Sequence, residues 1–207
     1  MTVTPETAPL LSLLAADLHH ALTVTLLGVS KDSTTVPMLH CVHVTKAGAT
    51  LTFMATDRYV LVRYVLELDQ EQAATPDFAA LFNAARIKPA MALLKAKGLD
   101  HVTFGATGTE GLRANHELPG DHEPQASEFP PVARLIPERV EHTEDASGIM
   151  YVNFEHFTRF TPAKLNARHL KDKTSSMRLQ GAVAGKPMRL DYGDRITIAT
   201  LTQRFQH

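Results

Sequence analysis

The sequence has little of what would build a disulfide framework or a membrane anchor. Cys41 is the single cysteine among 207 residues, so no internal disulfide can form, which favours a reducing, cytoplasmic location. No apolar run approaches the roughly 20 residues of a membrane-spanning helix. The N-terminal stretch lacks the basic flank and small-residue cleavage site of a signal peptide. We therefore expect a cytoplasmic protein without a membrane partner.

A net charge of one strong sign is also missing. The chain has 21 Lys and Arg against 22 Asp and Glu, which gives a formal net charge of -1. Any binding to nucleic acid would therefore depend on local basic patches, because the whole molecule is nearly neutral. With 44% hydrophobic residues, the chain can bury one large core or two small ones.

The motifs of common enzymes are absent from the sequence. It has no G-x-S-x-G, P-loop, G-x-G-x-x-G or CxxC pattern. Of the 11 histidines only His19 and His20 are adjacent, and none forms the i, i+4 pair of a helical zinc site. Cys41 lies in an alternating segment typical of a buried strand, and Asp57 is more typical of a corner that bonds its own backbone than of a catalytic acid. We expect no enzymatic activity, no cofactor and no metal.

Helices and strands are predicted to alternate in three approximate units. Leucines at three- and four-residue spacing predict a helix over 10 to about 27, so the first unit begins either with this helix or with a poorly marked strand. The strands that follow are expected at 38–45, 49–56 and 59–68. A turn at 46–48 and a corner at Asp57 and Arg58 join these strands.

The other two units read strand, helix, strands. In the second unit a strand is expected at 78–84, a helix at 85–98 and a hairpin over 99–118. Pro89 suits the first turn of that helix and Gly98 its C-cap. The third unit is predicted to have a strand at 149–154, a helix at 155–173 and strands at 177–184, 186–192 and 194–205. Helices alternating with hairpins favour an α+β fold with antiparallel sheet over a doubly wound parallel fold.

Basic side chains gather on the second and third predicted helices. Long cationic side chains on rigid helices suit sequence-independent contact with DNA phosphates. A solvated helix face remains the alternative. The first helix carries few charges and does not add to this pattern. The candidate DNA-facing residues are Arg86, Lys88, Lys95, Lys97, Arg159, Lys164, Arg168, Lys171 and Lys173.

Three short motifs, in order along the chain, resemble those of bacterial sliding clamps, the beta subunit of DNA polymerase III. Residues 55–61 read A-T-D-R-Y-V-L where that family has A-T-D-G-H-R-L. Residues 129–137 read F-P-P-V-A-R-L-I-P and are similar to the family's connector F-P-x-x-x-R-[VL]-[IL]-P. Residues 201–205 read L-T-Q-R-F where the family ends in M-P-M-R-L.

The resemblance implies a DNA-clamp-like fold made of repeats of helix plus antiparallel sheet, with sheets outside and helices facing DNA. It also implies that the three motifs converge on an apolar pocket for short hydrophobic peptides of a DNA polymerase, a clamp loader or repair proteins. Plain core packing of the leucines is the alternative. The pocket residues carried over by position are Thr56, Arg58, Tyr59, Val60, Leu61, Pro130, Arg134, Leu135, Ala199, Leu201, Thr202, Gln203, Arg204 and Phe205.

Substitutions within the motifs are the first departure from the family pattern. Arg58 stands where the family has glycine, so the corner must accept a side chain there. Val60 replaces an arginine, and Thr202 and Gln203 replace proline and methionine, so we expect either an altered peptide specificity or a pocket that no longer binds peptides.

The second departure is length. The chain accounts for a paired domain, 1–137, and a single strand-helix-sheet unit, 138–207. Four copies of three units would complete a twelve-unit ring, so we expect a homo-oligomer that encircles double-stranded DNA non-specifically and acts as a processivity factor. A clamp-derived interaction module or replisome regulator that does not encircle DNA is the alternative, and a small-molecule enzyme on the same scaffold is a more remote one.

Overall fold

The structure is a computed structural model, and it describes residues 10–31, 36–95, 98–106, 108–109, 112–113, 129–139, 158–160, 165, 178–180 and 187–201. The first unit contains β1 (Leu10–Leu14), α1 (Ala15–Thr25), η1 (Leu26–Gly28), η2 (Pro37–His40), β2 (Cys41–Ala47), β3 (Thr50–Thr56) and β4 (Val60–Glu67). The second contains α2 (Gln70–Ala73), β5 (Phe78–Asn83), α3 (Ala84–Leu93), β6 (His101–Gly105), β7 (Gly108–Thr109) and β8 (Leu112–Arg113). Beyond these lie η4 (Val132–Leu135), β9 (Arg178–Gln180), β10 (Pro187–Tyr192) and β11 (Ile196–Leu201).

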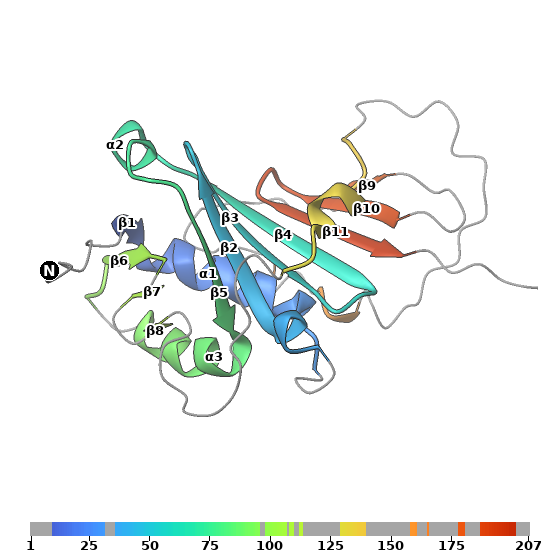
Figure 1. Cartoon of the computed structure of the whole chain (residues 1–207), viewed down its shortest axis with the longest axis horizontal. Coiled ribbons are helices and arrows are strands. Elements are labelled where there is room, and N and C mark those ends of the chain that lie inside the picture. Colours follow the sequence, from blue (N-terminus) through green and yellow to red (C-terminus); the bar gives the residue numbers. More distant parts are fainter. Residues whose placement is uncertain are drawn as a thin grey trace, which may run out of the picture.

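The strands form two antiparallel sheets, which confirms the predicted α+β class. The larger sheet has seven strands in the order β5-β2-β3-β4-β11-β10-β9, and the smaller has the order β1-β6-β7-β8. The helices α1 and α3 lie together on one side of the larger sheet (Figure 1). One layer of helices therefore covers one face of the sheet, while the other face is left to the connector that contains η4.

The first two units are interlocked by an exchange of strands. The opening strand of the first unit, β1, pairs with β6 of the second, with Leu11 opposite Phe104. In return β5, which opens the second unit, pairs with β2 of the first. The third unit extends the larger sheet through the pairing of β11 with β4. One sheet thus runs across the domain boundary expected at 137 and 138.

The helix expected from residue 10 begins later, at Ala15. Leu10–Leu14 is a strand in which Leu11 and Leu13 are buried while Leu10 and Leu14 are exposed. Five residues of this composition fit either period. Pairing with β6 gives the backbone N–H and C=O groups of the strand their partners, and this favours the strand.

The second helix also differs from expectation at both marked residues. Pro89 lies inside α3 and not in its first turn. The hydrogen bond that Pro89 cannot make would have gone to the carbonyl of Ala85, and both residues are exposed, so water can serve that carbonyl. The C-cap of α3 is Leu94 rather than Gly98, which follows with a φ of +84°.

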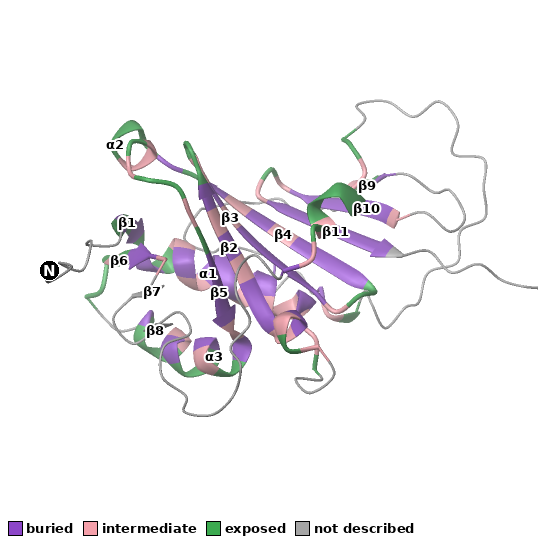
Figure 2. Ribbon diagram, in the orientation of Figure 1, coloured by how far each residue is buried: buried purple, intermediate pink, exposed green. Residues whose placement is uncertain are grey.

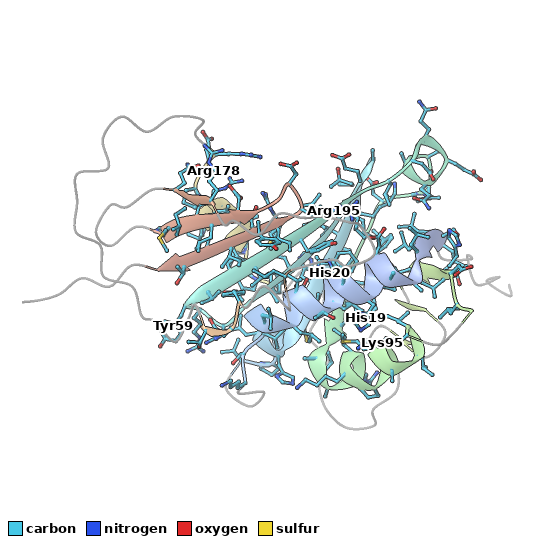
Figure 3. The ribbon with its side chains drawn as sticks, turned by 180° about the vertical axis from the view of Figure 1, so that it is seen from behind. His19, His20, Tyr59, Lys95, Arg178 and Arg195 are labelled. Carbon is cyan, nitrogen blue, oxygen red and sulfur yellow. The ribbon has the colours of Figure 1, made fainter. Side chains whose placement is uncertain are left out.

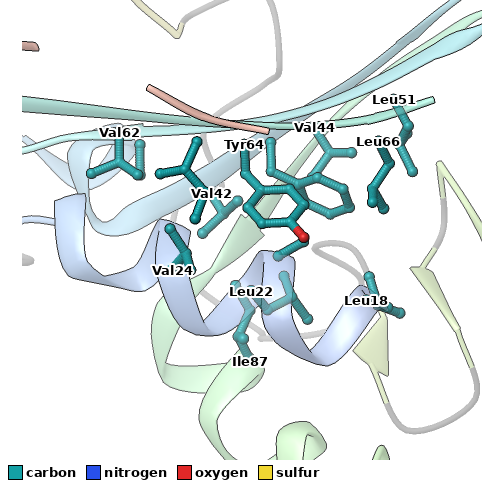
Figure 4. Close-up of a cluster of buried hydrophobic side chains, with 14 of the residues drawn as sticks. Leu18, Leu22, Val24, Val42, Val44, Leu51, Val62, Tyr64, Leu66 and Ile87 are labelled. Carbon is teal, nitrogen blue, oxygen red and sulfur yellow. The ribbon is translucent and has the colours of Figure 1, made fainter. Parts of the chain in front are cut away.

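The main core fills the space between the helix layer and the larger sheet. Leu18, Leu22 and Val24 of α1 and Ile87 of α3 point at the strands (Figure 4). Val42, Val44, Leu51, Val62, Tyr64 and Leu66 meet them from β2, β3 and β4. Figure 2 shows these central strands as buried along most of their length. Each such apolar side chain contributes roughly 1.5–3 kcal/mol, so this layer is the main source of stability.

A smaller apolar cluster lies on the opposite face of the sheet. It contains Cys41, Met54, Leu61, Leu81, Phe129 and Ala199. Side chains alternate between the faces of a strand, so Leu61 belongs to this cluster while its neighbour Val62 points into the main core. Cys41 is fully buried here, as expected of a small core residue.

Candidate functional site

The corner between β3 and β4 is closed by side chains that bond the local backbone. Asp57 Oδ1 accepts hydrogen bonds from the backbone N–H groups of Tyr59, at 3.0 Å, and Val60, at 2.8 Å. The Thr56 hydroxyl donates to the Val60 carbonyl at 2.8 Å and accepts from the Arg58 N–H at 3.2 Å. The expectation that Asp57 forms the corner is therefore confirmed.

The tight corner forces one residue into the left-handed region. Arg58 has a φ of 81° and is the non-glycine residue with positive φ in the described part of the chain. A Cβ atom disfavours this conformation, which glycine adopts freely. The hydrogen bonds on either side of Arg58 fix the path of the backbone and hold this residue in the strained conformation. As a result, the side chains of Arg58 and Tyr59 are both exposed at the end of the sheet.

The connector 129–139 crosses the outer face of the larger sheet. The Phe129 ring stacks on His43 with centroids 4.6 Å apart, and Val132 and Ile136 pack on the smaller apolar cluster. Arg189 donates to the Pro137 carbonyl at 2.8 Å. The connector is thus held from β2 as far as β10. Burial under it lowers the pKa of His43 from the usual histidine value.

The C-terminal strand β11 places its end beside the corner. Ala199 pairs with Leu61, and Thr200 pairs with Val60 at the start of β4. On the other side of β11, Pro187 of β10 is paired with Leu201. The corner, the connector and the end of β11, which lie far apart in the sequence, are therefore neighbours in the structure.

These segments enclose a shallow groove of about 40 Å³. Its floor includes Leu61 and Ala199, each 4% exposed, and its rim includes Tyr59, 60% exposed, and Leu135, 50% exposed. The exposed rim and the apolar floor thus lie together around one hollow. The residues that line the groove are Thr56, Arg58, Tyr59, Val60, Leu61, Val132, Leu135, Pro187, Ala199 and Thr200.

The structure brings most of the described candidate pocket residues together, but not all of them. Pro130 and Arg134 lie on the connector without lining the groove, and the Arg134 side chain is exposed. Val132, Pro187 and Thr200 were missed. Val132 lies within a motif that was recognised, whereas Pro187 is brought in by strand pairing alone. Leu201 ends β11, and Thr202, Gln203, Arg204 and Phe205 lie outside the described residues.

The candidate DNA-facing residues lie partly within the described chain. Lys88 and Lys95 are exposed on the α3 side, and Figure 3 shows Lys95 beside α3. Arg86 on the same helix is half-buried. In α1 Ala16 is exposed and Asp17, His19 and Thr23 are half-buried, and none of these residues is a lysine or arginine. The remaining candidates, Lys97, Lys164, Arg168, Lys171 and Lys173, lie outside the described residues.

Arg159 has a different role from a free surface cation. Its guanidinium forms an ion pair with Asp57 Oδ2 at 2.5 Å, and the Asp57 side chain is only 10% exposed. The same Asp57 carboxylate thus bonds the corner with one oxygen and the third unit with the other. This pair neutralises much of the Arg159 charge and attaches the third unit to the groove.

A buried polar network joins the third unit to the first helix. The His20 Nε2–H donates to the Leu165 carbonyl at 3.0 Å, so its Nδ1 accepts from the Tyr64 hydroxyl at 2.9 Å. Burial raises the pKa of Tyr64. Arg195 forms an ion pair with Asp17 of α1 at 3.2 Å. Figure 3 shows His20 between α1 and the sheet, where it holds elements of both units in place.

Neither a metal centre nor a membrane segment is found among the described residues. No group of three or more His, Cys, Asp or Glu side chains there could hold a metal ion. The helices in the same part of the chain are all too short or too polar to cross a membrane.

Comparison with solved structures finds this fold in bacterial sliding clamps. The DNA polymerase III beta subunit of Thermotoga maritima has a TM-score of 0.70 and 13% identity, over 100% of this chain and 68% of that chain. The sliding clamp of Bacillus subtilis has a TM-score of 0.64 and 14% identity, over 100% of this chain and 67% of that chain. A clamp of Bartonella birtlesii, solved with griselimycin bound, has a TM-score of 0.60 and 16% identity, over 99% of this chain and 68% of that chain.

The chain therefore has the sliding-clamp fold, which confirms the structural side of the resemblance seen in the motifs. It spans about two thirds of the length of those clamps. In sequence, no family model and no curated protein matches it. At these identities the likeness is one of fold, and the function has to be argued from the groove and the helix layer.

Proposed function

We propose that this protein is a cytoplasmic clamp-type processivity factor. It tethers a DNA polymerase, and in turn a clamp loader or repair proteins, to double-stranded DNA without reading the base sequence. The partners dock through short hydrophobic peptides in the groove beside the corner. The helix layer, with Lys88 and Lys95 exposed, faces the DNA, while the connector and the groove lie on the other side of the sheet.

The observation that carries the proposal is the convergence of three segments on one groove. The corner, the connector and β11 come from positions as distant as Thr56, Leu135 and Ala199, and they meet on a single hollow. Core packing alone accounts for the buried Leu61, but it does not account for Tyr59 and Leu135, which remain exposed at the rim. An apolar floor with aromatic and arginine side chains around it suits an apolar peptide anchor within a polar surround.

Sliding on DNA requires contacts that carry no base readout. Lysines that reach phosphate oxygens provide this, because their attraction depends on charge and falls with added salt. A ring of four copies would supply twelve units and hold DNA topologically. This arrangement predicts a tetramer in solution, and absolute mass from light scattering at several concentrations tests it.

The groove is tested with a fluorescein-labelled peptide that carries adjacent leucine and phenylalanine side chains. Leu135→Asp should weaken its binding by roughly 10- to 100-fold, because burying one such side chain is worth about 1.5–3 kcal/mol and 1.4 kcal/mol is a factor of ten. Leu135 is preferable to Leu61, since aspartate at the buried Leu61 would destabilise the fold itself.

Leu179→Asp provides the matched control. Leu179 is exposed on β9 and does not line the groove, so this variant should bind the peptide as the wild type does. Fluorescence anisotropy measures both affinities. Equal affinities for Leu135→Asp and Leu179→Asp would place peptide docking elsewhere or remove it.

A second candidate is an interaction module with the clamp fold that does not encircle DNA. Two observations favour it, because both limit the positive charge of the helix layer. The residues of α1 that are not buried include Asp17 but no lysine or arginine, and Arg159 is paired with Asp57. Strong peptide binding by a protein that is monomeric and does not bind duplex DNA would select this alternative.

A further inference from the structure

A cavity of about 490 Å³ lies where the three units meet, away from the peptide groove. Its walls come from η1 and the residues after it, from His40 at the end of η2, from the start of α3, and from Thr158 and Arg159 of the third unit. None of its lining residues lines the groove.

The lining of this cavity combines apolar and cationic side chains. Leu26, Leu27, Val29 and Ala84 form the apolar wall. Lys31, Lys88, Arg159 and His40 lie around it, and the described lining includes no carboxylate. Lys31 and Lys88 are both exposed, and Lys88 lies on α3. Arg159 is already paired with Asp57, so Lys31 and Lys88 are the cations of this lining that suit an anionic ligand.

Two of the polar groups are held in position before any ligand arrives. Arg159 is fixed by its ion pair with Asp57 and also approaches the Leu27 carbonyl at 3.5 Å. The His40 ring donates from Nδ1 to the Ser30 carbonyl at 2.8 Å, since a carbonyl oxygen can only accept. This bond sets the orientation of the ring, which is thus a fixed part of the cavity wall.

We propose that this cavity takes one phosphate of the DNA backbone, with the attached deoxyribose against the apolar wall. The inference rests on the proposed function. It adds a defined phosphate-binding site to the general electrostatic attraction between the helix layer and DNA. Lys31 and Lys88 contact the phosphate oxygens, and Leu26, Leu27 and Val29 cover the carbon-rich face of the sugar. Neither Lys31 nor His40 was among the residues that the sequence indicated for DNA contact.

A variant that fills the cavity without changing the charge distinguishes binding in this phosphate-binding site from long-range electrostatic attraction. Leu27 is half-buried and lines the cavity, so Leu27→Trp should reduce the affinity for a labelled duplex at least fivefold in low salt. Leu179→Trp is the control, because Leu179 is exposed on β9, outside the helix layer, and does not line the cavity. It should bind DNA as the wild type does. Circular dichroism establishes that both variants are folded.

A pair of charge-neutralising variants tests the same phosphate-binding site. Both substitutions are at exposed positions, so they should leave the fold intact. Lys88→Gln and Lys95→Gln each remove one positive charge from the α3 side, but only Lys88 lines the cavity. Lys88→Gln should lower the slope of log affinity against log salt by about one, and Lys95→Gln by clearly less.

The outcomes separate the two levels of the proposal. Wild-type affinity for Leu27→Trp together with equal effects of Lys88→Gln and Lys95→Gln would overturn the cavity inference and leave DNA binding by the helix layer intact. If the wild-type protein does not bind duplex DNA, both the DNA-tethering function and the phosphate-binding site are overturned. Deoxyadenosine monophosphate distinguishes the sources of phosphate: binding of this nucleotide without binding of duplex overturns the assignment to DNA.

Discussion

Replacing Arg58 by glycine should stabilise the protein, although it removes a charged side chain from the groove. Arg58 has a φ of 81°, where a residue with a Cβ atom is disfavoured by roughly 1–2 kcal/mol. The hydrogen bond of this residue to the Thr56 hydroxyl comes from the backbone N–H, so it survives the substitution. Because its side chain is exposed, little packing is lost.

The gain is partly offset in the unfolded chain. Glycine has more backbone freedom to lose on folding, which costs about 0.5–1 kcal/mol relative to a residue with a side chain. The difference leaves a net stabilisation of about 0.5–1 kcal/mol for Arg58→Gly. For a protein of this length, each 1 kcal/mol corresponds to roughly 2–4 °C in Tm.

Urea unfolding followed by circular dichroism measures the change, with two matched substitutions beside it. Arg58→Ala removes the guanidinium but keeps the Cβ atom, so it should not stabilise the protein. Gly48→Ala makes the opposite change: Gly48 has a φ of +54°, and an added Cβ would meet nothing within 4 Å. Its destabilisation, about 1 kcal/mol, isolates the backbone term.

The order of stability decides whether this reasoning is right. Arg58→Gly should be the most stable, with Arg58→Ala close to or below the wild type. If Arg58→Gly is no more stable than Arg58→Ala, the corner does not store strain at this residue. The glycine of the related clamp motif would then need another explanation.

Two further predictions concern the packing of η1 and of the connector. Gly28→Ala should destabilise the protein by roughly 1–3 kcal/mol in urea unfolding, because the new Cβ would lie 2.7 Å from Val62 Cγ2 and 2.9 Å from the Ala55 carbonyl oxygen; unchanged stability would mean that η1 can move away from the sheet. Burial lowers the pKa of His43 in the folded protein below the usual 6.5. The unfolded chain therefore binds a proton at this histidine more readily than the folded protein does. The stability that is fully present above pH 6.5 is lost as the pH falls below 6.5 and through the folded pKa. His43→Phe keeps a ring against Phe129 and should lose less stability than the wild type between about pH 7.5 and about pH 5, whereas equal losses would contradict burial of His43 as the cause.

The sequence indicated the parts of the groove that short motifs carry. Asp57 and Thr56 lie in such a motif, and their bonds to the backbone within a few residues follow from local chemistry. Leu135 lies in another. Pro187 entered the groove through its pairing with Leu201, which depends on the register of β10 and β11. Register between strands is a property of the folded sheet, so no local pattern pointed to Pro187.

Partners far apart in the chain were likewise not predictable. Arg159 looked like a surface cation because it lies among other basic residues, yet its partner Asp57 is 102 positions away. No local pattern pointed to the role of His20, because its bonds to Tyr64 and to Leu165 span 44 and 145 positions. The strand Leu10–Leu14 was mistaken for helix because five leucine-rich residues satisfy both periods, and pairing with β6 decides between them.

The order of the units in space differs from their order in the chain, and this bears on the proposed ring. The first unit lies in the middle: it exchanges strands with the second unit and pairs β4 with β11 of the third. The edge strands are β1 and β8 in the smaller sheet and β5 and β9 in the larger, and of these β8 belongs to the second unit and β9 to the third. A head-to-tail ring must join surfaces at opposite ends of the subunit, because a contact that uses one end alone stops at a dimer. In the ring that we propose, the second unit of one copy therefore meets the third unit of the next, and substitutions near β8 and near β9 should each dissociate it.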